Sequence, residues 1–146
     1  MITLSQEELE RFIFSCGLYK SKAKHILEAS RDIIERFGGE VPSSKENLIT
    51  LAGVGRKTAN VVYSVAFKGN AIAVDTHVFR VSNRIGLANA KDVVKTEKAL
   101  MEILDEEDWS RAHHYLIYLG RSICKAQKPD CVNCPINSYC EKKIKR

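Results

Sequence analysis

Apolar residues recur every three to four positions along most of this chain, in segments separated by glycine, proline or capping residues. This spacing places them on one face of a helix, and no run alternates convincingly between apolar and polar residues as a half-buried strand would. The pattern predicts helices over about 5–16, 21–37, 44–51, 56–67, 76–85, 90–104 and 110–124. We therefore expect an all-α fold, in which only the apolar segment 71–74 resembles a short buried strand.

Several of these helices carry recognisable end signals. Ser5, followed three residues later by Glu8, forms a capping-box pattern, and Ser44 and Asp75 stand where an N-cap side chain is expected. The glycine pair at 38–39 ends the second predicted helix, because glycine readily adopts the left-handed conformation of a C-cap. Local chemistry thus predicts these helix boundaries.

Composition limits the kinds of protein this chain can be. It has 146 residues, of which 45% are hydrophobic, and a formal net charge of +5, which is compatible with a polyanionic partner or with ordinary solubility. No apolar run approaches the ~20 residues of a membrane span. The N-terminal sequence MITLSQEELE is acidic, unlike a secretory signal, so we expect a cytoplasmic protein associated with the nucleoid.

We expect two helical lobes. The first, 1–72, contains a glycine hairpin, and the second, 73–146, ends in a cysteine-rich loop at 124–140. Helical periodicity stops after Cys124, which marks the start of this loop.

The hairpin lies between two predicted helices. Gly53 and Gly55 flank Val54, and glycine both tolerates positive φ and lets another backbone approach closely. Val54 is expected to point inward. The helix that begins near Arg56 then directs its N-terminal amides and positive dipole end outward, where a phosphate oxygen would bind, with Lys57 beside it.

The cysteine loop is the most specific motif in the chain. Its four thiols follow the spacing C-x6-C-x2-C-x5-C, which suits either tetrahedral zinc or a 4Fe-4S cluster. One compact loop supplies every ligand with uneven gaps, and this favours the 4Fe-4S cluster over zinc. The ligands are Cys124, Cys131, Cys134 and Cys140. The fifth cysteine, Cys16, is distant in the sequence and is expected to be a small buried residue.

A bound metal would hold this loop in one conformation, because the loop has too few apolar residues to fix itself by burial. Lys125 and Lys128 would then be presented on a rigid backbone that suits contacts with DNA phosphates. An ordinary solvated surface is the alternative for both lysines. A redox role for the metal is also open.

Four motifs occur in a familiar order: LAGVGRKTAN at 51–60, AVDTHVFRV at 73–81, the pairs at 113–114 and 120–121, and the cysteine loop. Over nearly its whole length the chain resembles endonuclease III. The resemblance implies a helix-hairpin-helix DNA glycosylase with abasic-site lyase activity, which acts on oxidised pyrimidines in double-stranded DNA and carries a 4Fe-4S cluster. One departure is Ala52, where the family commonly has proline.

The resemblance also implies roles for individual residues. Lys57 would be the catalytic amine and Asp75 the catalytic carboxylate, while the hairpin, together with Arg56 and Thr58, would contact DNA. These roles make chemical sense, because an amine that attacks the sugar C1′ gives a Schiff base and permits β-elimination. Asp75 would stabilise the sugar cation. The alternatives are a solvated lysine and an aspartate that only caps a helix.

Family members carry further helices before the segment that matches 13–19, so we expect an N-terminally shortened glycosylase fold. Self-association or a second chain would cover the apolar face that those helices cover in relatives. Three other functions stay open. They are a DNA-binding module without catalysis, an adenine-mismatch glycosylase, and a metal-stapled interaction or redox domain.

Overall fold

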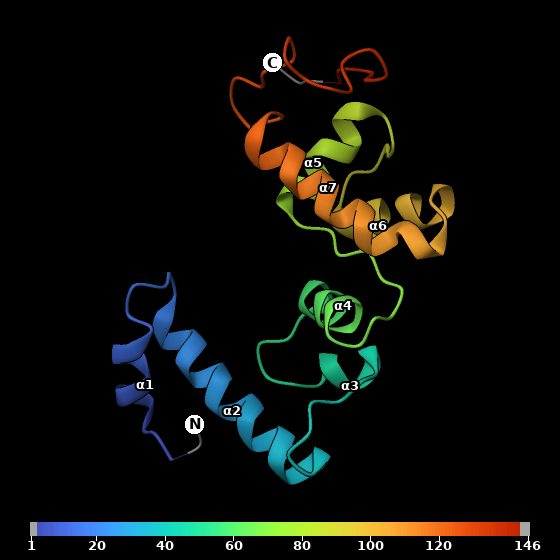
Figure 1. Ribbon diagram of the computed structural model, residues 1–146. Coiled ribbons are helices and arrows are strands. Elements are labelled where there is room, and N and C mark those ends of the chain that lie inside the picture. The colour runs from blue at the N-terminus through green and yellow to red at the C-terminus, as the bar shows by residue number, and fades with distance from the viewer. Residues whose placement is uncertain (1–2, 144–146) are drawn as a thin grey trace. The chain divides into compact units, whose positions relative to one another are not determined.

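A computed structural model of the chain describes residues 3–143 and contains only helices and their connections within that range. The all-α prediction is confirmed (Figure 1). In chain order the elements are α1 Gln6–Phe12, α2 Tyr19–Phe37, α3 Lys45–Ile49, α4 Arg56–Val65, α5 Thr76–Ile85, α6 Val93–Ile103, the 3-10 turn η1 Glu106–Asp108 and α7 Trp109–Ser122.

The chain divides into two compact units, Met1–Ala59 and Asn60–Arg146. The first turn of α4 belongs to the first unit and the rest of α4 to the second. The lobe boundary expected from the sequence, between residues 72 and 73, stays a prediction. Each unit is described below by itself.

The first unit is built on the packing of α1 against α2. Leu9 of α1 and Ala23 and Leu27 of α2 form its buried cluster. Ser5 and Glu8 make the predicted capping box, with the Ser5 N–H donating to Glu8 Oε2 at 2.7 Å.

The end of α1 differs from the prediction. The helix stops at Phe12 rather than near residue 16, and the connection to α2 turns through Cys16, whose N–H donates to the carbonyl of Ile13. Cys16 is exposed, so the expectation of a buried thiol is wrong. Two large apolar residues of the same connection, Phe14 and Leu18, are also exposed. A cysteine in a turn with few packing partners has nothing to bury it.

The remaining caps of this unit follow the sequence. Gly38, with φ +63°, is the C-cap of α2, and Ser44 Oγ accepts from the N–H of Asn47 at the start of α3. Arg36, near the end of α2, donates from Nη2 to Thr50 Oγ1 at 2.9 Å. This bond connects α2 to the residue just before the glycine hairpin.

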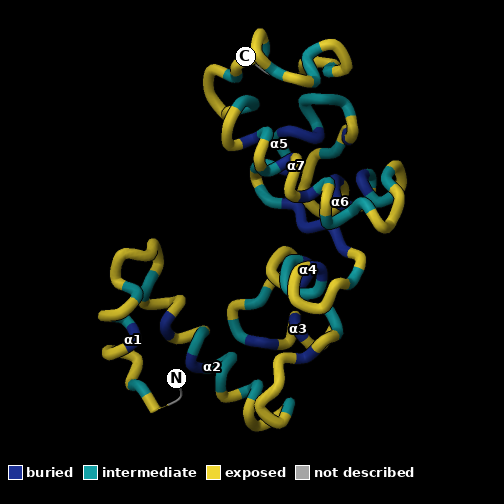
Figure 2. The backbone as a smooth tube through the Cα atoms, in the orientation of Figure 1, coloured by how far each residue is buried: buried dark blue, intermediate teal, exposed yellow. Residues whose placement is uncertain are grey.

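The second unit has a larger core, in which α5 and α7 lie side by side and α6 packs on α5. Trp109 packs against this core and donates from Nε1 to the carbonyl of Leu104 at 3.1 Å. The buried residues of the core are Ile72, Val74, Val78, Val81, Leu100 and Leu116. Figure 2 shows this burial as dark segments along α5 and the chain that leads into it.

The segment 71–74 is fully buried but forms no strand, so that possibility is wrong. Side chains take the place of a partner strand. Asn60 Nδ2 donates to the carbonyl of Ile72 at 3.0 Å, and His113 Nδ1 lies 2.6 Å from the carbonyl of Ala73. Both side chains are themselves buried. The apolar segment is therefore held by one amide and one imidazole from distant positions in the sequence.

Within residues 3–143, no helix combines the length and the apolar character that crossing a membrane requires.

Candidate functional site

The hairpin turns on a single glycine. Gly53 has φ +73°, and a Cβ built on it would lie 2.8 Å from the Cβ of His25 on α2. Gly55 has no positive φ, and a Cβ there would meet nothing within 4 Å. The two glycines thus differ: Gly53 makes the turn, whereas Gly55 leaves open space on the hairpin surface. Val54 is partly buried, as predicted, and its N–H donates to the carbonyl of Leu51 at 3.1 Å.

A hollow of about 570 Å³ lies between α2 and the hairpin within the first unit. Its lining residues are Lys22, His25, Ile26, Ala29, Ala52, Gly53 and Val54. The first turn of α4 follows directly, and Arg56, Lys57 and Thr58 are all exposed there. The predicted DNA-contacting residues are therefore accessible and stand at a helix N-terminus, where the amides and the dipole favour a phosphate.

Asp75 is half-buried and is the N-cap of α5, as its position in the sequence indicates. Its Oδ1 accepts from the N–H groups of His77 and Val78, both at 2.8 Å. These two bonds fix the orientation of the carboxylate at the start of the helix.

His113 supports the same region from α7. A carbonyl oxygen only accepts hydrogen bonds, so the 2.6 Å contact with Ala73 requires a hydrogen on His113 Nδ1. His113 is buried, whereas its neighbour His114 is exposed and reaches only the carbonyl of Ser110. The two neighbouring histidines thus differ: His113 is a hydrogen-bonded core residue and His114 is not buried. His113 thereby helps to position the backbone two residues before Asp75.

Lys57 belongs to the first unit and Asp75 to the second. Their roles as catalytic amine and catalytic carboxylate stay predictions.

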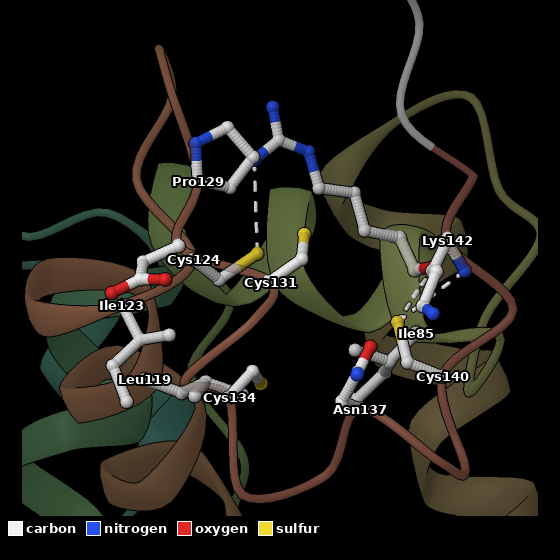
Figure 3. Close-up of a pocket in the computed structure, with 12 residues that line it drawn as sticks. Ile85, Leu119, Ile123, Cys124, Pro129, Cys131, Cys134, Asn137, Cys140 and Lys142 are labelled. Atoms are coloured by element: carbon white, nitrogen blue, oxygen red, sulfur yellow. Dashed lines mark hydrogen bonds between the residues drawn. The ribbon is translucent and has the colours of Figure 1, made fainter.

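The four cysteines of the loop surround one hollow (Figure 3). All four are free and half-buried. Apolar side chains complete the wall, among them Ile85 at the end of α5, Leu119 of α7 and Pro129 of the loop. Polar residues, among them Arg84 and Asn137, also line it, so the cavity offers four thiols together with hydrogen-bond donors to a metal group.

The arrangement fits a cluster whose four irons each take one thiolate. Among residues 3–143, no three histidine, cysteine, aspartate or glutamate side chains are close enough to bind a single metal ion. Tetrahedral zinc needs its four sulfurs at about 2.3 Å from one ion, whereas a 4Fe-4S cluster keeps its four ligands apart. Donors already face two of the sulfurs: Arg84 Nη1 lies 3.6 Å from Cys124 Sγ, and the N–H of Lys142 donates to Cys140 Sγ at 3.3 Å.

Helix α5 holds the first part of this loop through two arginines. Arg80 Nη2 donates to the carbonyls of Gly120 at 2.9 Å and Cys124 at 3.1 Å. Arg80 thereby satisfies carbonyls at the C-terminal end of α7, which have no partner inside that helix.

Arg84, one turn further along α5, reaches the loop itself. It donates to the carbonyl of Lys125 at 2.6 Å and to that of Ala126 at 2.9 Å. These bonds join a charged donor to neutral acceptors and are therefore stronger than ordinary amide bonds.

The last part of the loop is tied to the end of α5 by backbone bonds. The N–H of Glu141 donates to the carbonyl of Ile85 at 3.3 Å, and the N–H of Lys143 donates to that of Arg84 at 3.0 Å. Helix α5 thus has Asp75 as its N-cap and contacts both ends of the cysteine loop from its last two turns.

The two loop lysines are exposed, and Lys128 adopts a left-handed conformation with φ +48°. Between the first two cysteines the loop backbone is held by Asp130. Hydrogen bonds from the side chain and the backbone of Asn133, together with the nearby charge of Lys125, hold the pKa of Asp130 below its ordinary value. The N–H of Asp130 also donates to the carbonyl of Ile123 at 3.0 Å, and this bond closes the segment that carries both lysines. Whether the lysines meet phosphates stays a prediction.

The sequence analysis missed four residues that position the site: Asn60, Arg80, Arg84 and His113. The arginines had a usable signal, because they are four positions apart and so share one face of a helix. Asn60 offered no such signal, since its partner is a backbone carbonyl twelve residues away.

Comparison with known proteins adds to this geometry. Residues 1–106 match the HhH-GPD superfamily of base excision DNA repair proteins, and residues 124–140 match the iron-sulfur binding domain of endonuclease III. The predicted 4Fe-4S cofactor is therefore confirmed, and the loop is an iron-sulfur binding domain.

Relatives match nearly the whole chain. Endonuclease III of Bacillus subtilis is 56% identical over 141 residues, which are 96% of this chain and 64% of that protein. Endonuclease III of Haemophilus influenzae is 48% identical over 99% of this chain and 69% of that protein. The chain thus spans about two thirds of the length of the curated relatives it matches.

Solved structures agree with these matches. A trapped covalent intermediate of endonuclease III with DNA has a TM-score of 0.92 and 49% identity, covering 97% of this chain and 67% of that one. A thermostable thymine-DNA glycosylase has a TM-score of 0.83 at 26% identity, covering 97% of this chain and 67% of that one. The helix-hairpin-helix glycosylase fold expected from the sequence is confirmed, and the chain belongs to the endonuclease III family.

Proposed function

We propose that this chain is a DNA N-glycosylase with abasic-site lyase activity that removes oxidised pyrimidines from double-stranded DNA. The observation that carries the proposal is the identity of 48–56% with endonuclease III over 96–99% of the chain. A similar protein has been captured as a covalent intermediate with DNA, which supports chemistry through a nucleophile of the enzyme.

Lys57 supplies the nucleophile in this mechanism. Its neutral amine attacks C1′ of the damaged nucleotide, and the bond from C1′ to the base breaks as the base leaves with a proton. The resulting amine adduct opens to a protonated Schiff base. Loss of a proton from C2′ then drives β-elimination, in which the bond between C3′ and its phosphate oxygen breaks. Water releases the lysine.

Asp75 has an electrostatic role. As C1′ loses its base, positive charge develops on the sugar, and a carboxylate fixed in position stabilises that charge without reorganising. The two N–H groups that bond Oδ1 hold the carboxylate in place, and His113 holds the backbone that precedes it. Asp75 can also accept and return protons during formation of the Schiff base.

Two surfaces bind the DNA backbone in this proposal. The exposed hairpin and the first turn of α4 offer amides to one phosphate, and Lys125 and Lys128 on the cysteine loop contact others. Because the reacting C1′ is inaccessible inside a duplex, the damaged nucleotide must rotate out of the helix. Such a protein works on chromosomal DNA, which is in the cytoplasm of a bacterial cell.

The cluster, when bound, supplies structural cross-linking of the loop and a redox-active centre. The protein's own contacts also position that loop, because Arg84 and the backbone of Ile85 hold its two ends.

The test is an assay of the purified chain with its cluster on duplexes that contain thymine glycol or an abasic site, with and without borohydride. We expect strand cleavage, and a covalent protein–DNA adduct when borohydride reduces the Schiff base. Lys57→Gln should abolish both, and Asp75→Asn should slow cleavage at least tenfold, about 1.4 kcal/mol in the barrier.

Lys98→Gln is the matched control, since Lys98 is an exposed lysine on α6. It should leave cleavage and trapping unchanged. Duplex binding without cleavage or an adduct would overturn the proposal and favour a DNA-binding module, and base removal without an adduct would favour a glycosylase of the adenine-mismatch kind.

A further inference from the structure

The hollow in the cysteine loop contains one polar atom without a partner. Asn137 lines this hollow, and its Oδ1 is the one buried side-chain oxygen or nitrogen in residues 3–143 that makes no hydrogen bond. Leaving such an atom unpaired is unfavourable, because the buried oxygen has lost its hydrogen bonds to water. This unpaired buried oxygen belongs to a residue that lines the hollow between the four cysteines.

The position of Asn137 is fixed by the loop. Its backbone N–H donates to the carbonyl of Cys134 at 3.0 Å, which places the residue in the turn between the third and fourth cysteines. Figure 3 shows the amide beside Cys140 on the wall of the hollow. Asn137 therefore lies between two cluster ligands in the sequence, Cys134 and Cys140.

The charge of a bound cluster determines whether the amide oxygen or the amide nitrogen of Asn137 should point into the hollow. Four thiolates and four sulfides make the sulfur surface electron-rich, so a carbonyl oxygen facing it is repelled and an N–H is attracted. A half-turn about the bond between Cβ and Cγ exchanges the amide oxygen and nitrogen without moving the rest of the side chain. Two donors already face sulfurs of the loop, Arg84 Nη1 at Cys124 and the Lys142 N–H at Cys140, while Cys140 Sγ also lies 3.7 Å from the carbonyl oxygen of Arg84.

We propose that Asn137 donates a hydrogen bond from its amide nitrogen to a sulfur of the bound cluster, and that this bond raises the reduction potential of the cluster. Hydrogen bonds to cluster sulfurs withdraw electron density and stabilise the reduced form. Asn137 would act on the cluster and not on the DNA. This role goes beyond the proposed repair activity, and it holds whether or not Lys57 is a nucleophile.

The experiment measures the midpoint potential of the whole chain with its cluster reconstituted, by voltammetry without DNA. Asn137→Leu should shift the potential downward and speed the loss of the cluster's visible absorption in air severalfold. Asn133→Leu is the matched control, because Asn133 is exposed on the same loop and its amide bonds Asp130 rather than lining the hollow. The control should keep the wild-type potential.

Two further variants keep the test decisive if Asn137→Leu takes up no iron. Asn137→Asp, similar in shape but with a negative charge in place of the donor, should lower the potential further than any neutral change. Asn137→Gln keeps an amide and should stay closer to wild type than the aspartate variant does. Wild-type potentials in every loaded variant at position 137, or an equal shift in Asn133→Leu, would overturn the proposal.

Discussion

The glycine hairpin and the cysteine loop are both proposed to meet DNA phosphates, but they hold their shapes by different means. The hairpin is local: Gly53 turns the chain, and Val54 bonds a carbonyl three residues earlier. The loop depends on distant residues, since Arg84 bonds carbonyls 41 and 42 positions further along the chain. A turn fixed by neighbouring residues can be recognised in the sequence, whereas hydrogen bonds between distant residues depend on how the whole unit folds.

The largest expected loss of stability comes from removing the hydrogen bonds of Arg84 to the cysteine loop. Arg84→Met deletes two strong bonds to the loop and the contact with Cys124, and should lower the stability of the second unit by about 3 kcal/mol. The variant should also lose its iron faster to a chelator. Denaturant unfolding and the decay of cluster absorption measure both effects.

Arg121→Met serves as the control, because Arg121 is exposed on α7. If Arg84→Met were as stable as this control, the loop would be held by its metal alone and the contrast with the hairpin would disappear.

Removing the hydrogen bond of His113 to the segment before Asp75 should give the next largest loss of stability. His113→Leu leaves the buried carbonyl of Ala73 without a donor and should cost about 2 kcal/mol. It should also slow catalysis, since the segment that leads into Asp75 loses a hydrogen bond. His114→Leu changes the exposed neighbour and should alter stability little. Equal unfolding midpoints for the two variants would contradict a supporting role for His113.

Within the hairpin, the two glycines should respond differently. Gly53→Ala forces a side chain into positive φ and against His25, at a cost of about 1–2 kcal/mol. Gly55→Ala should leave stability nearly unchanged but weaken duplex binding, because its Cβ would occupy the open space that a phosphate needs. Thermal unfolding measures the stability loss in Gly53→Ala, and a titration with duplex DNA measures the weaker binding of Gly55→Ala. A stability loss of similar size in both variants would show that Gly55 also shapes the turn.

The smallest effect concerns the capping box of α1. Ser5→Ala should destabilise the first unit by about 1 kcal/mol. The hydrogen bond from the Ser5 N–H, followed by that of its side chain, holds the pKa of Glu8 below its ordinary value of 4.5. A carboxyl group whose pKa is lower in the folded chain than in the unfolded chain stabilises the folded state at pH values above its unfolded pKa. This stabilisation is lost as the pH falls through the folded pKa.

The stability difference between wild type and Ser5→Ala should therefore be larger at pH 7 than at pH 3, as measured by circular dichroism of the isolated chain. A difference that grows on acidification would contradict this assignment of the cap.

The sequence predicted the parts of the fold that neighbouring residues determine. Ser5, Ser44 and Asp75 cap the expected helices, and Gly38 ends α2, because each acts on backbone groups within a few positions. The cysteine spacing was equally informative, since all four ligands lie within one loop.

The features that the sequence did not predict depend on contacts between residues far apart in the chain. The segment 71–74 has the composition of a strand, but Asn60 and His113 satisfy its carbonyls, and neither residue is near it in sequence. The exposure of Cys16 likewise depends on where α1 ends and on what packs around the turn. Periodicity reports which face of an element is apolar but not which distant side chain will bond its backbone.

The most direct measurement for the central claim is to find the atom that becomes bonded to DNA. An abasic duplex is trapped with borohydride on the whole protein, the complex is digested, and the modified peptide is sequenced by mass spectrometry. The account predicts one nucleotide remnant on Nζ of Lys57, and none when the reaction is repeated with Lys57→Gln. A remnant on another residue, with Lys57 unmodified, would contradict it.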